Sequence, residues 1–393
     1  MAAEYPDPPA GHPSLSAADL KRRLDGGESV RLLDVRDRDE FEQWRIEGAS
    51  VTATQLPFAK FLQAKATGEV EPLVASVDGE GPITVVCARG EASAFVAGLL
   101  QRHGVDARNL ADGMYGWARL YEAREVPCDE ATVVQYDRPS SGCLSYLVVG
   151  DGEAAVVDPL RAFAGRYAAD AGARDADLVA AVDTHVHADH VSGLRLLADD
   201  HGVEAVVPAR AADRGVAFPV TELADDGSVA VGAASLDAVP LPGHTTGMTG
   251  LRVGDALLAG DSLFLDGVAR PDLEAGDDGA AALARSLHES LTERLAPLPD
   301  ETLVAPGHYA PDTEPAADGT YTARLGDLRA RLAAFSMDRE TFVERVCAGM
   351  PPQPANYERI VAVNLGTEDA DADTAFELEL GPNNCAAAPM ADD

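Results

Sequence analysis

The seven residues Thr184 to His190, "THVHADH", hold three histidines and an aspartate in a chain of 393 residues that has nine histidines in all. The preceding "DLVAAVDTH" has the apolar, β-branched composition of a buried strand. The following "ADHVSGLRLLADDHG" has apolar positions at helical spacing and then a glycine. Imidazole and carboxylate groups packed this closely are typical of a metal site. The stretch therefore predicts a metal centre between a strand and a helix.

Three later segments with strand composition also end in a histidine or an aspartate. His244 lies in "LPGHTTGM", Asp261 follows "LLAG", and His308 follows "LVAPG". Rigid strands can hold ligands in a fixed geometry where their ends meet at one sheet edge. We therefore expect five histidines and two aspartates to converge. The seven candidate ligands are His185, His187, Asp189, His190, His244, Asp261 and His308.

The first part of the chain alternates strand and helix signals. "VRLLDVR" and "ITVVCARG" indicate buried strands, and "EASAFVAGLLQRHG" indicates a helix that ends at glycine. Cys87 closes the second strand and precedes the helix, where backbone N–H groups and the positive helix end favour a thiolate. Cys87 is therefore predicted to be reactive. The remaining cysteines are expected to be structural or incidental, since the chain has no CxxC pair: Cys128, Cys143, Cys347 and Cys385.

Three motifs, "LLDVRDRDEFEQWRIEGA", "VVCARGEASAFVAGLLQRHG" and "LADGMYGW", resemble the landmarks of a rhodanese domain over most of residues 14–128. The resemblance implies a small α/β domain in which Cys87 carries a persulfide sulfur inside the loop that follows it. The sequence departs from the family at Ala92, where many active members have a basic residue, and acidic Glu91 lies beside it. Arg89 is the candidate to supply the positive charge. An anionic sulfur donor such as thiosulfate is disfavoured by this departure.

The motifs "THVHADH", "PGHTTGM", "GDSLF" and "PGH" are similar to those of the metallo-β-lactamase superfamily over about residues 130–310. This resemblance implies an αββα sandwich with the metal at one edge of its two sheets. The whole chain is thus expected to be α/β, with a rhodanese-like domain at 14–128 and a metallo-β-lactamase-type domain at 129–367. The second domain is expected to include a C-terminal helical region. Residues 368–393 are expected to form an acidic, mobile tail.

The spacing leaves two metal arrangements open. In one, His185, His244 and Asp261 hold a single Fe(II) per chain with open positions for O2 and a substrate sulfur, while the other four candidates orient ligands and water as surrounding groups. In the other, all seven residues hold two zinc ions, which activate a hydroxide for thioester hydrolysis as in glyoxalase II.

The flanking segments "GDSLFLDGVARPDL" and "GMPPQPANYERIVAVNLG" resemble persulfide dioxygenases, including members fused to rhodanese domains, and so favour the iron arrangement. The resemblance implies oxidation of a low-molecular-weight thiol persulfide by O2 to sulfite and thiol, with sulfane-sulfur transfer by Cys87. Arg270 and Tyr309 are the candidates for substrate binding. The alternative role for Arg270 is to support the loop near the substrate. The alternative is a dinuclear zinc thioester hydrolase whose rhodanese-like domain is a non-catalytic sulfur-sensing or binding module.

The formal net charge is −35, and the 66 acidic residues are spread over every segment. Such a field would repel nucleic acid and anionic membranes. Diffuse acid with scarce Lys is typical of salt-adapted proteins. No apolar run approaches the length of a membrane span, and "MAAEYPDPPAGHPSLS" lacks the pattern of a secretory signal. We therefore expect a cytoplasmic protein from a salt-loving organism. Its partners are expected to be small molecules rather than nucleic acid or membranes, and the assembly considered is a homodimer.

Overall fold

The computed structural model describes residues 13–77, 79–348 and 350–387. Contacts within the chain divide it into two compact units, Met1–Leu120 and Tyr121–Asp393. Each unit has its own sheets and its own apolar core, and each is described separately below.

The first unit is a five-stranded parallel sheet with the strand order β1-β5-β4-β2-β3. Successive side chains of a strand point to opposite faces. Accordingly, Leu33 packs with Phe61 and Phe95 on one face, and Leu32 packs with Trp117 on the other. Helices therefore cover both faces, which confirms the expected small α/β domain. Its elements are β1 (Ser14–Leu15), α1 (Ala17–Asp25), β2 (Val30–Asp34), α2 (Arg38–Gln43), β3 (Val51–Gln55), α3 (Phe58–Thr67), α4 (Val70–Val77), β4 (Ile83–Val86), α5 (Glu91–Arg102), β5 (Ala107–Leu110) and α6 (Gly113–Ala118).

The second unit contains two mixed sheets. A seven-stranded sheet has the order β12-β11-β10-β9-β8-β7-β6, and a six-stranded sheet has the order β13-β14-β15-β16-β17-β18. The strands of the first sheet are β6 (Glu122–Val126), β7 (Thr132–Arg138), β8 (Cys143–Gly150), β9 (Glu153–Val157), β10 (Asp177–Val182), β11 (Glu204–Pro208) and β12 (Thr221–Leu223). Those of the second are β13 (Ser228–Val231), β14 (Ala234–Pro240), β15 (Thr249–Val253), β16 (Ala256–Gly260), β17 (Leu303–Pro306) and β18 (Ala323–Arg324).

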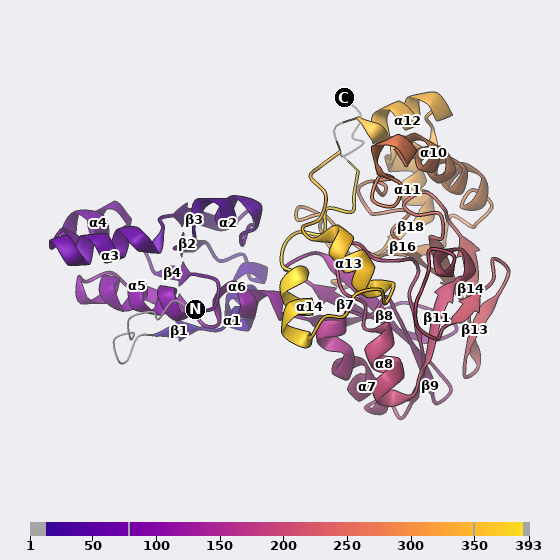
Figure 1. Cartoon of the computed structure of the whole chain (residues 1–393), viewed down its shortest axis with the longest axis horizontal. Coiled ribbons are helices and arrows are strands. Elements are labelled where there is room, and N and C mark those ends of the chain that lie inside the picture. The colour runs from indigo at the N-terminus through magenta and orange to yellow at the C-terminus, as the bar shows by residue number, and fades with distance from the viewer. Residues whose placement is uncertain (1–12, 78, 349, 388–393) are drawn as a thin grey trace. The chain divides into compact units, whose positions relative to one another are not determined.

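The two sheets lie face to face between helices. Tyr146 and Leu258 belong to an apolar cluster made by strands of both sheets. On the outer face of the first sheet, Leu147 packs with the helix residue Tyr167, and on that of the second, Leu257 packs with Leu287. The helices are α7 (Ala164–Gly172), α8 (Leu194–His201), α9 (Ala209–Ala212), α10 (Gly276–Glu289), α11 (Leu325–Arg331), α12 (Arg339–Cys347), α13 (Tyr357–Asn364) and α14 (Ala372–Leu378) (Figure 1). This four-layer arrangement confirms the expected αββα sandwich.

The division between the units lies earlier than the predicted domain boundary after residue 128. The reason is β6, which pairs antiparallel with β7 along its whole length and so belongs to the sheet of the second unit. The sequence "YEAREV" at 121–126 mixes polar and apolar residues without a continuous apolar run, so it fits an edge strand of either domain. Pairing partners, rather than local pattern, place this strand.

The part of the predicted tail that the structure describes, 368–387, contains a helix whose side chains pack on the domain. α14 begins with an N-cap at Asp371 and buries Phe376 and Leu378. Glu379, at the end of this helix, forms a buried ion pair with Arg138 at 2.8 Å. The composition is acidic, but these apolar and paired side chains are enough to hold the segment on the domain. Residues 388–393 lie outside the described part of the chain.

Among the described residues, none of the helices has both the length and the apolar composition required to cross a membrane.

Candidate metal centre and reactive cysteine

The seven candidate ligands lie where strands of the two sheets end. β10 leads into "THVHADH", β16 ends immediately before Asp261, and β17 ends two residues before His308. β10 runs parallel to β9, and β16 runs parallel to β17, so the carboxyl ends of each pair lie at the same edge. All seven side chains are buried. The structure therefore brings together the residues that the sequence placed in one centre.

His185, His244 and Asp261 form a compact group of donor atoms. The Nε2 atoms of the two histidines lie 3.9 Å and 3.8 Å from the same carboxylate oxygen, Asp261 Oδ2. None of these three buried atoms has a hydrogen-bond partner among the described residues. Buried polar atoms normally have partners, so three unpartnered atoms that face one another indicate a cation between them.

The opposite side of each of these three groups is held by a hydrogen bond. His244 Nδ1 donates to the backbone oxygen of Arg270 at 2.8 Å, and His185 Nδ1 lies 2.9 Å from the Thr184 hydroxyl. Asp261 Oδ1 accepts from His308 Nδ1 at 2.6 Å. A bond at Nδ1 fixes the ring and leaves the lone pair on Nε2, which is the arrangement found around metal-binding histidines.

The protonation of the group also suits a cation. Burial, with a further contribution from His187, lowers the pKa of His185 well below its usual value, and burial lowers the pKa of His244. Burial alone would raise the pKa of Asp261, but His308 and the two other histidines outweigh it and keep that pKa low. Two neutral imidazoles and one carboxylate result. The donor set therefore fits a divalent transition metal with N and O preference, such as iron or zinc.

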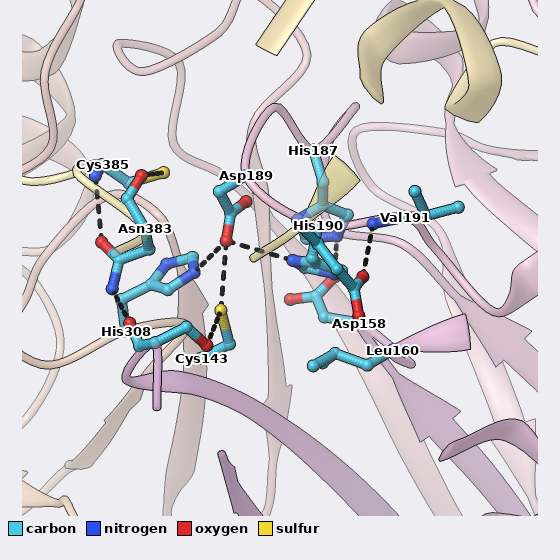
Figure 2. Close-up of polar contacts among 12 residues, drawn as sticks. Cys143, Asp158, Leu160, His187, Asp189, His190, Val191, His308, Asn383 and Cys385 are labelled. Atoms are coloured by element: carbon cyan, nitrogen blue, oxygen red, sulfur yellow. Dashed lines mark hydrogen bonds and ion pairs between the residues drawn. The ribbon is translucent and has the colours of Figure 1, made fainter. Parts of the chain in front are cut away.

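A second buried group lies beside the first, and its members are hydrogen-bonded to one another through Asp189. Asp189 Oδ2 accepts from His308 Nε2 at 2.8 Å, from His190 Nδ1 at 3.2 Å and from the Cys143 thiol at 3.2 Å (Figure 2). His308 therefore contacts a carboxylate through each of its nitrogens. Burial opposes a charge on His308, but Asp261 and Asp189 raise its pKa well above the usual value. His308 thus lies between two carboxylates and links the two groups.

His187 is hydrogen-bonded to a third buried carboxylate, Asp158. Its Nε2 donates to Asp158 Oδ1 at 3.0 Å (Figure 2). The same carboxylate accepts from the backbone N–H and the hydroxyl of Thr184 at 2.7 Å and 2.9 Å. Asp158 thus supports both histidines of "HVH". Asp158 was not among the predicted site residues. The available signal was its place at the end of β9 in "AVVDP", where an aspartate interrupts a buried strand.

Two cysteines that were predicted to be incidental line the centre. Cys143 belongs to the second buried group, and Cys385 lies within reach of Asp261 and His308. Burial, together with the nearby Asp189 and Asp261, raises the pKa of Cys385 well above its usual value, so its thiol is protonated. Cys385 comes from the C-terminal segment, and no spacing in the sequence relates it to the strand ends.

The Arg270 side chain is engaged by the protein rather than directed at an open position. Its guanidinium pairs with Asp272 at 2.7 Å and donates to the backbone oxygens of Pro352 and Asn384 at 2.9 Å and 3.1 Å. Its own backbone oxygen holds His244. Of the two roles considered for Arg270, these contacts match support of the loop.

Tyr309 is also engaged by the protein. Its hydroxyl donates to Asp137 at 2.7 Å, and its ring stacks on Tyr321 with centroids 3.6 Å apart. Burial and the neighbouring Asp137 raise the pKa of Tyr309 well above its usual value. A substrate would have to compete with Asp137 for this hydroxyl.

In the first unit, Cys87 lies between the end of β4 and the start of α5. Its Sγ accepts a hydrogen bond from the Gly90 backbone N–H at 3.1 Å and lies 3.1 Å from the Ser93 hydroxyl. The motif "ADGMYGW" packs against this loop, since Met114 N–H donates to the Cys87 oxygen at 2.9 Å. A Cβ on Gly113 would lie 2.1 Å from that oxygen, and φ there is +54°. This close approach explains the glycine.

Arg89, the predicted source of positive charge, lies over the ring of Tyr115 at 4.1 Å and donates to its hydroxyl at 3.0 Å. Ala92 is buried in the first turn of α5, and Glu91 is exposed. The Cys87 sulfur has a backbone N–H and a hydroxyl as donors, from Gly90 and Ser93.

Comparison with known proteins gives two matching family models. Residues 139–308 match the metallo-beta-lactamase superfamily, and residues 16–120 match the rhodanese-like domain. Both resemblances seen in the sequence are thereby confirmed.

Similar curated proteins fall into two groups. The chain is 31% identical over 237 residues to bovine mitochondrial persulfide dioxygenase ETHE1, covering 59% of this chain and 86% of the bovine protein. The human protein is 31% identical over 180 residues, with 66% of its length covered. A hydroxyacylglutathione hydrolase of Anaeromyxobacter dehalogenans is 32% identical over 256 residues, covering 62% of this chain and 89% of the hydrolase.

Solved structures show the same likeness. ETHE1 from Myxococcus xanthus superposes with a TM-score of 0.51 at 25% identity, covering 63% of this chain and all of that one. A metallo-beta-lactamase from Staphylococcus aureus superposes with a TM-score of 0.54 at 24% identity, covering 60% of this chain and 73% of that one, and supports the fold alone.

Proposed function

Because the chain belongs to the metallo-β-lactamase superfamily and carries an N-terminal rhodanese-like domain, we propose that it is an iron-dependent persulfide dioxygenase that also transfers sulfane sulfur. Its substrates would be a low-molecular-weight thiol persulfide and O2, and its products thiol and sulfite. The likeness to persulfide dioxygenases supports this choice within the superfamily.

One observation carries the proposal. His185, His244 and Asp261 each have one atom fixed by the protein and one unpartnered atom that faces the others. In the neighbouring group, Asp189 Oδ2 and both nitrogens of His308 are already engaged in hydrogen bonds, although Asp189 Oδ1 and His190 Nε2 have no partner among the described residues. Two imidazoles and one carboxylate on one ion leave further coordination positions open, as in the iron oxygenases that use this ligand set.

In the overall reaction, RSSH, O2 and water give RSH, hydrogen sulfite and a proton. The sulfane sulfur is oxidised and O2 is reduced, so no other electron donor is required. An iron(II) ion on the three residues would supply the binding and activation of O2. The protein supplies the rest: Thr184 and Arg270 orient the two imidazoles, and His308 holds a proton beside Asp261 and keeps that carboxylate fixed.

The rhodanese-like domain would handle the same kind of sulfur. Cys87 is 5% exposed and lies at the positive end of α5, with a backbone N–H directed at its sulfur. A persulfide on Cys87 could be passed to a small thiol, and the resulting thiol persulfide is the substrate of the metal centre. A hydrolase would have no use for Cys87.

The test of the metal centre is O2 uptake by the Fe(II)-loaded full chain with a small-molecule persulfide, with sulfite measured alongside. We expect equal amounts of O2 consumed and sulfite formed. His244→Ala should abolish both and reduce bound iron, because Asp261 and His185 alone cannot hold it tightly. His201→Ala, which alters an exposed histidine at the end of α8, is the matched control and should retain both. Uptake that persists in His244→Ala would contradict the proposal.

The test of the sulfur-transfer site is Cys87→Ser. The variant should lose persulfide formation at Cys87, measured by mass spectrometry after anaerobic treatment with a thiol persulfide. It should keep O2 uptake with an added small-molecule persulfide, because the metal centre lies in the other compact unit. Sulfur transfer at the unsubstituted rate would instead support a non-catalytic sulfur-binding module.

A second candidate function is thioester hydrolysis by two zinc ions. It is favoured by the unpartnered buried atoms of three further candidate ligands among the described residues, His187 Nδ1, Asp189 Oδ1 and His190 Nε2, and by the likeness to hydroxyacylglutathione hydrolases. Its test is hydrolysis of a glutathione thioester by the zinc-loaded chain. Turnover that requires two zinc ions per chain and no O2 would favour this candidate over the dioxygenase.

A further inference from the structure

The sulfur of Cys87 is one end of a short buried chain of polar groups. Ser93 Oγ lies 3.1 Å from Cys87 Sγ and 2.7 Å from Asn109 Oδ1. Ser93 is fully buried, and Cys87 and Asn109 are each 5% exposed. Ser93 comes from the first turn of α5, and Asn109 comes from β5, the strand beside β4. Three separate elements thus converge on one hydroxyl next to the sulfur.

Sulfur transfer concentrates charge on this particular sulfur atom. When an acceptor attacks the outer sulfur of a Cys87 persulfide, the new bond forms to that outer atom. The S–S bond breaks, and its electron pair stays on Sγ as a thiolate. A hydrogen bond to Sγ is therefore stronger in the transition state than in the persulfide, and it lowers the barrier to sulfur transfer.

We propose that the Ser93 hydroxyl donates a hydrogen bond to Cys87 Sγ as the S–S bond breaks, and that Asn109 positions this hydroxyl. The inference rests on the proposed sulfur transfer at Cys87 and adds to it a catalytic residue, Ser93, and a positioning residue, Asn109. Together with the Gly90 N–H at 3.1 Å, Ser93 would give the leaving sulfur two donors.

The direction of the hydroxyl depends on Asn109. Ser93 has one proton and three acceptors in reach, namely Cys87 Sγ, the Gly90 oxygen at 3.1 Å and the Asn109 side chain. A side-chain amide can present either its oxygen or its NH2 group. When Asn109 presents its NH2 group, the amide donates to Ser93 and leaves the hydroxyl proton to the sulfur.

The composition of the loop also bears on which groups stabilise charge on the Cys87 sulfur. Between Cys87 and Ser93 the basic residue is Arg89, whose guanidinium lies over Tyr115. Ala92 occupies the place where many active rhodaneses have a basic residue. The Gly90 N–H and the Ser93 hydroxyl are the donors placed to stabilise charge on the leaving sulfur.

The experiment measures a single transfer from Cys87. The full chain is loaded anaerobically with glutathione persulfide and desalted, and cyanide is added as the acceptor. Thiocyanate formation then reports attack on the outer sulfur and release of the Cys87 thiolate. Ser93→Ala should transfer roughly tenfold more slowly or worse, the loss of one hydrogen bond to a charged group. Ser93→Thr, which keeps the hydroxyl, should be closer to the unsubstituted chain than to Ser93→Ala.

Two further variants separate catalysis from folding. Asn109→Asp keeps the shape but can only accept when ionised, so it should draw the hydroxyl proton away from the sulfur and slow transfer. Ser76→Ala is the matched control, because its hydroxyl contacts a helix oxygen in the same domain and lies at the surface. Its transfer rate should not change.

The outcomes are distinct. Transfer at the unsubstituted rate in Ser93→Ala overturns the inference and leaves the sulfur-transfer proposal intact. If Ser93→Ala does not fold, Asn109→Asp decides, and an unchanged rate in that variant overturns the inference. If the unsubstituted chain takes up no sulfur on Cys87, the proposed sulfur transfer fails and the inference fails with it.

Discussion

Arg270 connects a metal-ligand candidate, His244, to the C-terminal segment of the domain. Its backbone oxygen fixes His244, while its guanidinium pairs with Asp272 and holds two backbone oxygens of the C-terminal segment. Arg270 and Asp272 are 1% and 2% exposed. An Arg at this position can satisfy all of these acceptors at once because its donors form a planar fork.

Replacing Arg270 should therefore affect both stability and metal binding. Arg270→Met leaves Asp272 as a buried, unpaired carboxylate, and we expect the free energy of unfolding to fall by about 3–5 kcal/mol. Bound metal should also fall, because the loop that orients His244 loses its anchor. Arg339→Met, which breaks an ion pair of half-exposed side chains with Glu289, should cost no more than about 1 kcal/mol. Equal stability of the two variants in urea unfolding would contradict this role.

Single residues also mark the limit of what the sequence could predict at the site. The histidines and aspartates at strand ends are recognisable because each interrupts an apolar run, as in "LLAGDSLF". Cys143 and Cys385 carry no such mark, since an isolated cysteine has the composition of any small core residue. Arg270 could be placed near the site, but whether its side chain faces a substrate or a carboxylate depends on Asp272 and on backbone far along the chain.

At the level of single elements, α12 has a defined start. Asp338 is its N-cap and accepts from the Thr341 N–H at 3.1 Å and from the Thr341 hydroxyl at 2.7 Å. Phe342 and Val346 of the same helix are buried and belong to the apolar cluster that also contains Leu287 of α10. The cap therefore contributes to holding an outer layer of the sandwich.

The hydrogen bonds from Thr341 lower the pKa of Asp338 below its usual value. A lowered pKa in the folded state contributes stability above the unfolded pKa, and this contribution is lost as the pH falls through the folded pKa. Asp338→Ala should therefore lower the Tm at pH 7, and the difference from the unsubstituted chain should shrink in acid. Asp338→Asn, which still caps, should lose less at pH 7. A pH-independent difference for Asp338→Ala would rule out the charged cap.

Elements whose pattern is local were predictable, whereas those defined by distant partners were not. β4, β10 and β16 are continuous apolar runs bounded by glycine or polar residues, so their composition alone indicates buried strands. β6 needed its partner β7 to be assigned to a domain. α14 was taken for part of a mobile tail because acidic residues surround Phe376 and Leu378, and its stability depends on Glu379 pairing with Arg138 far earlier in the chain.

Over the whole molecule, the net charge of −35 means that the acidic side chains repel one another. Self-repulsion of this size destabilises a compact state, and salt screens it, because the Debye length falls from about 8 Å at 0.15 M to about 3 Å at 1 M. We therefore predict that the Tm rises when KCl is increased from about 0.15 M to about 1 M. Thermal unfolding followed by circular dichroism measures this directly. A Tm that is unchanged or lower at high salt would show that the acidic surface has no such cost.

The central claim is that one iron ion on His185, His244 and Asp261 performs the reaction. The most direct measurement is O2 uptake with a thiol persulfide while Fe(II) is titrated into metal-free full-length protein without O2 limitation. The account predicts that uptake and sulfite formation rise together and stop rising at one equivalent of iron per chain. A plateau at two equivalents, or no uptake in a chain that hydrolyses a thioester with zinc, would contradict it.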